Sequence, residues 1–118
     1  MDSSIIEGAA LDRLDEWGGP ALVGQMIRLF LEKSPERLEM VRAALADAPG
    51  DEAERGAHQL KSAAANLGAV RIQALAADVE AAAREGEVER IRELLPALES
   101  AVGEGCAELE RFLGGLEG

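Results

Sequence analysis

The residues best suited to chemistry lie in the stretch AHQLKSAAANLGA, residues 57–69, which contains His58, the single histidine of the chain. A neutral imidazole is nucleophilic near neutral pH and can accept a transferred group. In a helix, side chains three or four residues apart share a face. The face around the imidazole, called the His58 face below, consists of Arg55, His58, Lys61, Ser62 and Ala65. Because two of these side chains are very small, another protein surface can come close, and we expect His58 to react with a partner.

A carboxylate is expected beside the imidazole. Gly68 and Ala69 are predicted to reverse the chain, because glycine adopts the left-handed conformation that ends helices. Residues equally distant from this reversal meet across an antiparallel helix pair, which places Glu80 opposite His58. A carboxylate there accepts the Nδ1 proton and leaves Nε2 unprotonated and outward. Glu80 can also pair with Arg84, four residues later, and the two contacts are compatible.

Basic side chains gather around the imidazole, although the chain as a whole is acidic. Arg55 and Lys61 flank His58, and Arg84 lies one helical turn beyond Glu80. Such cations hold phosphoryl oxygens and attract an acidic partner pocket. The formal net charge of −11, in contrast, argues against nucleic acid and anionic membranes as partners, because both bind basic surfaces.

The remaining composition favours a cytoplasmic protein. The start, MDSSIIEGAA, lacks the features of a secretory signal, and no apolar run is long enough to cross a bilayer. Cys106 is the single cysteine, so an internal disulfide is impossible. One histidine and one cysteine make no metal site, and none is expected.

Helical periodicity recurs along the whole chain of 118 residues, and aromatic residues make up only 3%. Gly and Pro signals delimit the predicted helices, and Ser34-Pro35 is expected to kink or split the second of them. Asp51, with Glu54 three residues later, resembles an N-terminal capping box. The predicted helices cover residues 9–17, 21–46, 52–67, 70–85 and 88–113.

These elements predict an all-α fold, an antiparallel up-and-down four-helix bundle with a short additional N-terminal helix. The chain is long enough for one domain, and we expect a single domain over residues 1–118. Its ends, residues 1–8 and 114–118, are expected to be flexible.

The segment HQLKSAAANLGA, residues 58–69, resembles the histidine-containing phosphotransfer (HPt) domain of phosphorelays. The motif of that family reads roughly His-x-Leu-Lys-small and then Leu-Gly, and the likeness continues through residues 29–51 and 72–87. The resemblance implies that His58 is the phosphoacceptor, that Lys61 steadies the phosphoryl oxygens and that Glu80 orients the imidazole. It further implies that Ser62 occupies a motif position where the family has a small residue and that Gly68 is the glycine that ends the helix. Arg84 matches a position where the family has a basic residue less constantly.

The resemblance also implies a function. The domain would accept a phosphoryl group on His58 from a receiver aspartate or a histidine kinase and pass it to a response-regulator receiver, without autokinase activity. The Mg²⁺ ion belongs to the receiver, and the chain itself needs no cofactor. The sequence contains no nucleotide-binding glycine loop, which agrees with a chain that supplies only the accepting histidine. We expect a monomer whose partners are receivers and a sensor or hybrid histidine kinase.

Two alternatives stay open at this point. In the first alternative, the chain is the phosphoacceptor domain of a larger chemotaxis-type histidine kinase, and the presence of Glu80 rather than Gln keeps this interpretation open. The chain can also be read as a non-catalytic helical adaptor that binds through the small residues of the His58 face. In that interpretation His58 is a structural residue, and Lys61 and Arg84 are solvated charges.

Overall fold

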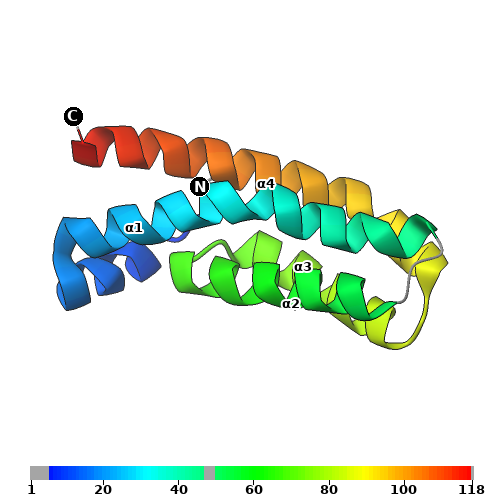
Figure 1. The fold of residues 1–118 in the computed structure, drawn as a ribbon. Helices are drawn as coiled ribbons and strands as arrows, with labels where there is room; N and C mark the ends of the chain where they lie inside the picture. The colour runs from blue at the N-terminus through cyan, green and yellow to red at the C-terminus, as the bar shows by residue number, and fades with distance from the viewer. Residues whose placement is uncertain (1–5, 47–49, 118) are drawn as a thin grey trace.

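Four helices make up most of the chain in the computed structural model, which describes residues 6–46 and 50–117. The elements in chain order are α1 (Gly8–Arg42), the 3₁₀ turn η1 (Ala43–Ala46), α2 (Gly50–Leu67), α3 (Val70–Arg84) and α4 (Val88–Glu117). The described residues contain no strand, which confirms the predicted all-α class. Each helix packs against two neighbours, α1 on α2 and α4, and α3 on α2 and α4. Figure 1 shows that the chain reverses direction between consecutive helices.

The core is aliphatic and depends on alanine for close helix packing. The inward residues of α2 follow a helical spacing of three or four and are at most 1% exposed: Ala53, Ala57, Leu60, Ala64 and Leu67. Phe30 of α1, Ile72 of α3 and Leu98 of α4 are buried to the same degree from the other three helices. Each large apolar side chain contributes about 1.5–3 kcal/mol when it leaves water. The buried stripe of α2 therefore fixes which of its faces remains outside, and His58 lies next to that stripe.

A glycine allows α1 and α2 to approach closely near the histidine. A Cβ atom at Gly56 would lie 2.7 Å from the Cβ of Met40 and 2.8 Å from the carbonyl oxygen of Arg37. Carbon atoms essentially never approach a neighbour that closely, so this position excludes every larger residue while the helices keep their spacing. Gly56 thus sets the distance between the two helices one half-turn before His58.

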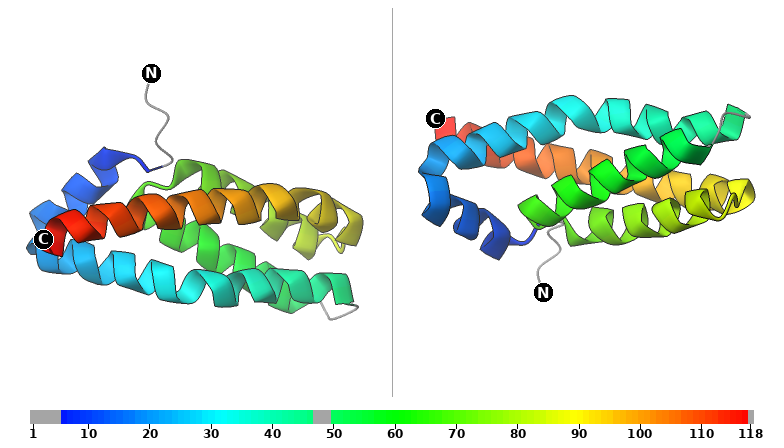
Figure 2. Two further views of the ribbon diagram at one scale, coloured as in Figure 1. Left: turned by 90° about the horizontal axis from the view of Figure 1, so that it is seen from above. Right: turned by 60° about the horizontal axis from the view of Figure 1, so that its bottom comes forward.

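The first part of α1 turns sharply away from the rest of the helix. Gly19 has φ 69° and ψ −172°, which is not helical, and Pro20 follows it. Figure 2 shows the N-terminal segment folding back at this point. The structure assigns one element across the break, so no separate helix over residues 9–17 is assigned, although the chain bends where GGP predicted an end.

The predicted split at Ser34-Pro35 is wrong. Helix α1 continues through both residues, and Gly19 is its only non-helical position. The buried hydroxyl of Ser34 donates to the carbonyl of Phe30 at 2.6 Å. A proline inside a helix costs about 3 kcal/mol. Burial of Phe30 and Leu38 on either side offsets that cost, because tertiary packing overrides a local preference.

Two helix boundaries differ from expectation. Helix α2 begins at Gly50, so Asp51 lies in its first turn instead of capping it, and the carboxylate of Glu54 reaches Arg84 instead of the helix start. Helix α4 continues to Glu117, so residues 114–117 are helical where an irregular tail was predicted.

The helix-ending role of Gly68 is confirmed. Helix α2 ends at Leu67, and Gly68 has φ 74°, the left-handed conformation that glycine adopts readily. The backbone N–H of Glu7 donates to the carbonyl of Gly68 at 2.8 Å, and Ile6 is buried. These two residues of the predicted flexible start are therefore packed on the α2–α3 turn, whereas residues 1–5, 47–49 and 118 lie outside the described part.

Within the described residues, no helix combines the length and apolar character that crossing a bilayer requires.

We predict that Gly56→Ala destabilises the fold by about 1–3 kcal/mol, because the added methyl group overpacks the α1–α2 contact. Gly103→Ala is the matched control, since it also lies within a helix and its Cβ would have no atom within 4 Å. It should stabilise the chain by up to about 1 kcal/mol through helix propensity. Urea unfolding followed by circular dichroism measures both. Equal changes in the free energy of unfolding for the two substitutions would show that the close approach of α1 and α2 does not restrict the residue at position 56.

Candidate functional site

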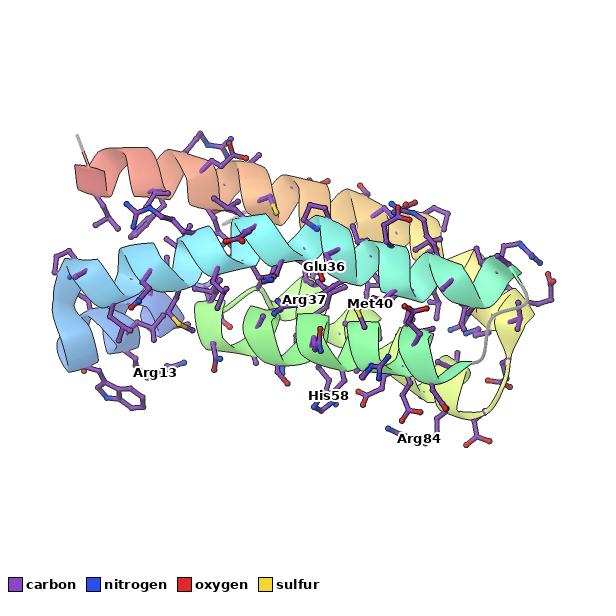
Figure 3. The ribbon with its side chains drawn as sticks, viewed as in Figure 1. Arg13, Glu36, Arg37, Met40, His58 and Arg84 are labelled. Carbon is purple, nitrogen blue, oxygen red and sulfur yellow. The ribbon has the colours of Figure 1, made fainter. Side chains whose placement is uncertain are left out.

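His58 projects from α2 on the outside of the bundle. Its side chain is 57% exposed, whereas the preceding Ala57 is fully buried. Nδ1 lies 3.0 Å from Oε2 of Glu80 on α3, so the contact predicted from the α2–α3 reversal is present. Figure 3 shows the imidazole pointing away from α1. With Nδ1 engaged and the ring mostly in solvent, Nε2 is the nitrogen that a partner can reach.

Glu80 is a buried carboxylate that binds three basic side chains. The residue is 6% exposed. Its Oε2 accepts from Nδ1 of His58 and from Nη2 of Arg84 at 3.2 Å, and its Oε1 lies 2.6 Å from Nζ of Lys61. Burial alone would raise the pKa of Glu80, but the hydrogen bonds from Lys61 and His58 outweigh it and lower the pKa overall. An ionised carboxylate can only accept hydrogen bonds, so the imidazole proton stays on Nδ1.

Lys61 lies close to the imidazole but binds the same carboxylate. Its side chain is 33% exposed, and its ammonium group is directed at Glu80. An ammonium group has three N–H donors, so contact with one oxygen leaves two that can bind other acceptors. The structure therefore places Lys61 beside His58 through their shared acceptor.

Arg84 connects α3 to α2 through Glu54 and also binds Glu80 of its own helix. Its Nε donates to Oε2 of Glu54 at 3.2 Å, and its Nη2 donates to Glu80. The side chain is 57% exposed. Glu54 was considered only as a capping residue, so its place in the site was missed. The signal was available, because Glu54 and Arg84 are equally distant from residue 69, as His58 and Glu80 are.

The other predicted partner-binding residues surround the imidazole on α2. Arg55, Ser62 and Ala65 are exposed, in agreement with an open His58 face. Gly68 is ten residues beyond His58, which is about 15 Å along a helix. It therefore belongs to the turn and sets the register of α2 and α3 without touching the site.

Two hollows adjoin the imidazole. One of about 460 Å³ is lined by Asp51, Glu54, Arg55, His58 and Glu80. The other, of about 270 Å³, lies between α1 and α2 and is called the α1–α2 groove below; its lining residues are Met26, Leu29, Phe30, Arg37, His58, Gln59, Ser62, Ala63, Asn66 and Leu67. Sequence reasoning missed the groove, because nothing in the chain indicated which residues of α1 face α2 at the level of His58.

Comparison with known proteins agrees with the geometry. The family model of the Hpt domain matches residues 25–111. A crystal structure of histidine-containing phosphotransfer protein B (HptB) from Pseudomonas aeruginosa PAO1 superimposes with a TM-score of 0.87 at 23% sequence identity. The match covers 96% of this chain and 97% of that one, and at this identity it shows a shared fold. No match was found among curated proteins.

The lowered pKa of Glu80 predicts how stability depends on pH. A carboxylate whose pKa is lower in the folded than in the unfolded chain contributes its full stability above the unfolded value, about 4.3. That contribution is lost as pH falls through the folded value. Glu80→Gln lacks it, so the difference in unfolding free energy between wild type and variant should be largest near pH 7 and shrink toward acid.

Urea unfolding of both proteins at a series of pH values measures this difference. Glu93→Gln is the control, because the Glu93 side chain is 68% exposed, and its profile should parallel the wild type. Parallel profiles for Glu80→Gln as well would contradict the assignment of an ionised, stabilising Glu80.

Proposed function

The chain belongs to the Hpt domain family, and on that premise we propose that His58 accepts a phosphoryl group from a receiver aspartate or a histidine kinase and passes it to a response-regulator receiver. Members of this family are phosphorelay intermediates of two-component signalling and act as phosphocarriers. The single observation that supports the assignment to His58 is the exposed imidazole whose Nδ1 is held at 3.0 Å by a buried carboxylate.

The transfer step follows from this tautomer. The lone pair of Nε2 attacks the phosphorus of the receiver's aspartyl phosphate in line, the Nε2–P bond forms and the P–O bond to the aspartate breaks. The aspartate carboxylate leaves with the bonding electron pair. The product is a phosphoramidate on an imidazolium ring that keeps its proton on Nδ1. Glu80 stabilises the positive charge that develops on the ring, because it is already ionised and in place.

Neighbouring side chains assist in defined ways. The remaining N–H donors of Lys61 reach phosphoryl oxygens, while Glu80 keeps its ammonium group near the ring. Arg84 supports Glu80, and Glu54 supports Arg84. The small Ser62 and Ala65 give a receiver room to approach, and Arg55 attracts its acidic pocket.

Several further properties complete the proposal. The chain has no autokinase activity, and the receiver supplies the Mg²⁺ ion and most of the electrostatic stabilisation of the transferring group. It functions as a cytoplasmic monomer. Its fold is an antiparallel up-and-down bundle, with the segment before Gly19 as an additional N-terminal helix.

The two alternatives are not favoured. A non-catalytic adaptor does not need a buried carboxylate that holds Nδ1 of His58, and Glu80 lies there at 3.0 Å. The phosphoacceptor domain of a larger kinase would use the same chemistry at His58. The source of the phosphoryl group distinguishes this alternative from the proposal, because such a domain receives its phosphoryl group from its own kinase.

Incubation with a phosphorylated receiver should transfer label to His58 and give an adduct that is labile in acid and stable in base. His58→Gln should abolish transfer because the nucleophile is removed. Ser62→Arg should also stop it, by steric exclusion at an exposed helix position that leaves the fold intact. Undiminished transfer to His58→Gln, or none to the wild type across a panel of receivers, would disprove the proposal.

Substitution of Glu80 separates orientation from charge. Glu80→Ala removes both and should reduce the transfer rate constant about 10- to 100-fold, the usual effect of losing a group that orients a reactive imidazole. Glu80→Gln keeps an oxygen that accepts the Nδ1 proton and should retain more activity. Rapid-quench measurement of phosphoryl transfer distinguishes the two variants. Identical rates for wild type and Glu80→Ala would remove Glu80 from the mechanism.

A further inference from the structure

Arg37 is an unpaired cation beside the proposed phosphorylation site. Its Nη1 is buried and has no hydrogen-bond partner among the described residues. Burial lowers the pKa of this guanidinium, which the nearby charge of Glu36 only partly counteracts. Glu36 acts on Arg37 only through its charge: no hydrogen bond or ion pair joins the two among the described residues, and the carboxylate of Glu36 lies 3.6 Å from Nζ of Lys33. A buried donor without an acceptor is unfavourable for folding, so the arginine needs an explanation outside the stability of the chain.

The surroundings of Arg37 are apolar or neutral. It enters the α1–α2 groove from α1, and no aspartate or glutamate is among the lining residues. Phe30 and the half-exposed Leu29 give one wall an apolar surface, and the amides of Gln59 and Asn66 belong to the other. A groove of this composition matches a partner segment that presents one carboxylate among apolar side chains.

The groove lies beside the imidazole, so a partner segment that fills it contacts both His58 and Arg37. His58 and Ser62 line the same groove as Arg37. Figure 3 shows Arg37 between α1 and α2, whereas His58 points away from α1. Lys61, in contrast, is drawn to the opposite side of α2 by Glu80 of α3. The two cations thus lie on opposite sides of the imidazole, and Lys61 is the one coupled to it through a shared acceptor.

We propose that Arg37 binds a carboxylate of the receiver domain that docks over His58, and that this pairing is a specificity determinant of the chain. The inference rests on the proposed phosphotransfer function. Arg37 is half-buried, and its long side chain can turn its guanidinium group toward the mouth of the groove. Pairing with a partner carboxylate supplies the acceptor that the free chain lacks. A receiver without an acid at that place leaves the guanidinium buried and unpaired, which disfavours the wrong partner.

The first test compares Arg37→Met with wild type. Receivers are phosphorylated with acetyl phosphate, and the receiver that exchanges phosphoryl groups fastest with the wild-type chain is used. Methionine keeps the apolar stem and removes the charge. The KM for the receiver should rise about tenfold or more, as for the loss of one partner of a buried charge pair, with the maximal transfer rate within about twofold. The unfolding midpoint should be unchanged or higher, because an unsatisfied donor has been removed.

Arg90→Met is the matched control, because it removes the same charge from an exposed position on α4. It should leave the KM unchanged. Arg37→Lys should give an intermediate KM, because it keeps the charge but loses the bidentate fork.

A second test identifies the partner group. Aspartates and glutamates of the receiver surface, outside its phosphorylation pocket, are changed one at a time to Asn or Gln. One of them should raise the KM for wild type and have no further effect with Arg37→Met, as a double-mutant cycle requires.

The outcomes separate this inference from the proposed function. Transfer by wild type with an unchanged KM for Arg37→Met overturns the pairing and leaves phosphotransfer standing. A lower maximal rate with an unchanged KM assigns Arg37 to the phosphoryl group instead, and a lowered unfolding midpoint assigns it to the fold; both overturn the proposal. No transfer by wild type to any receiver defeats the proposed function, and the inference fails with it.

Discussion

The ionised carboxylate of Glu80 is the group on which the site depends. An isolated carboxylate cannot remain charged in a protein interior, because the loss of hydration is far too costly. Here three donors from two helices compensate it, namely His58, Lys61 and Arg84. The same contacts keep the imidazole proton on Nδ1 and leave Nε2 unprotonated and open to solvent. The contacts that compensate the buried charge of Glu80 are therefore the same contacts that orient the exposed ring of His58.

The α2–α3 register that satisfies this requirement was predictable from the sequence. Gly68 and Ala69 form a tight turn, so residues of α2 and α3 that are equally distant from the turn in the sequence lie opposite each other. Glu80 therefore lies opposite His58. The same symmetry pairs Glu54 with Arg84, one helical turn away. The contact of Lys61 with Glu80 was not predictable in this way. Symmetry places residue 77 opposite Lys61, and a long flexible side chain reaches diagonally past that position to the buried carboxylate.

Where no tight turn relates two helices, prediction failed. Helix α1 is followed by η1 and by residues outside the described part, so the sequence contains no symmetry point for α1 and α2. The approach of α1 at Gly56 and the position of Arg37 were therefore missed. Local signals failed for a different reason at Pro35, where burial of the flanking apolar side chains kept α1 continuous. Periodicity identified the helices, but close contacts between helices depend on tertiary packing that no single stretch encodes.

The acidic total of the chain and its basic site act over different distances. A net charge of −11 disfavours acidic partners at long range, yet counter-ions screen exposed charges beyond about 8 Å at physiological ionic strength. Beside the imidazole, Arg55 is exposed and Arg37 lines the α1–α2 groove, whereas Lys61 and Arg84 are partly neutralised by Glu80 and Glu54. Attraction at the site is thus confined to surfaces that fit closely enough to exclude water. The few cations of this acidic chain consequently act through contact geometry, since the overall field of the chain favours no acidic surface.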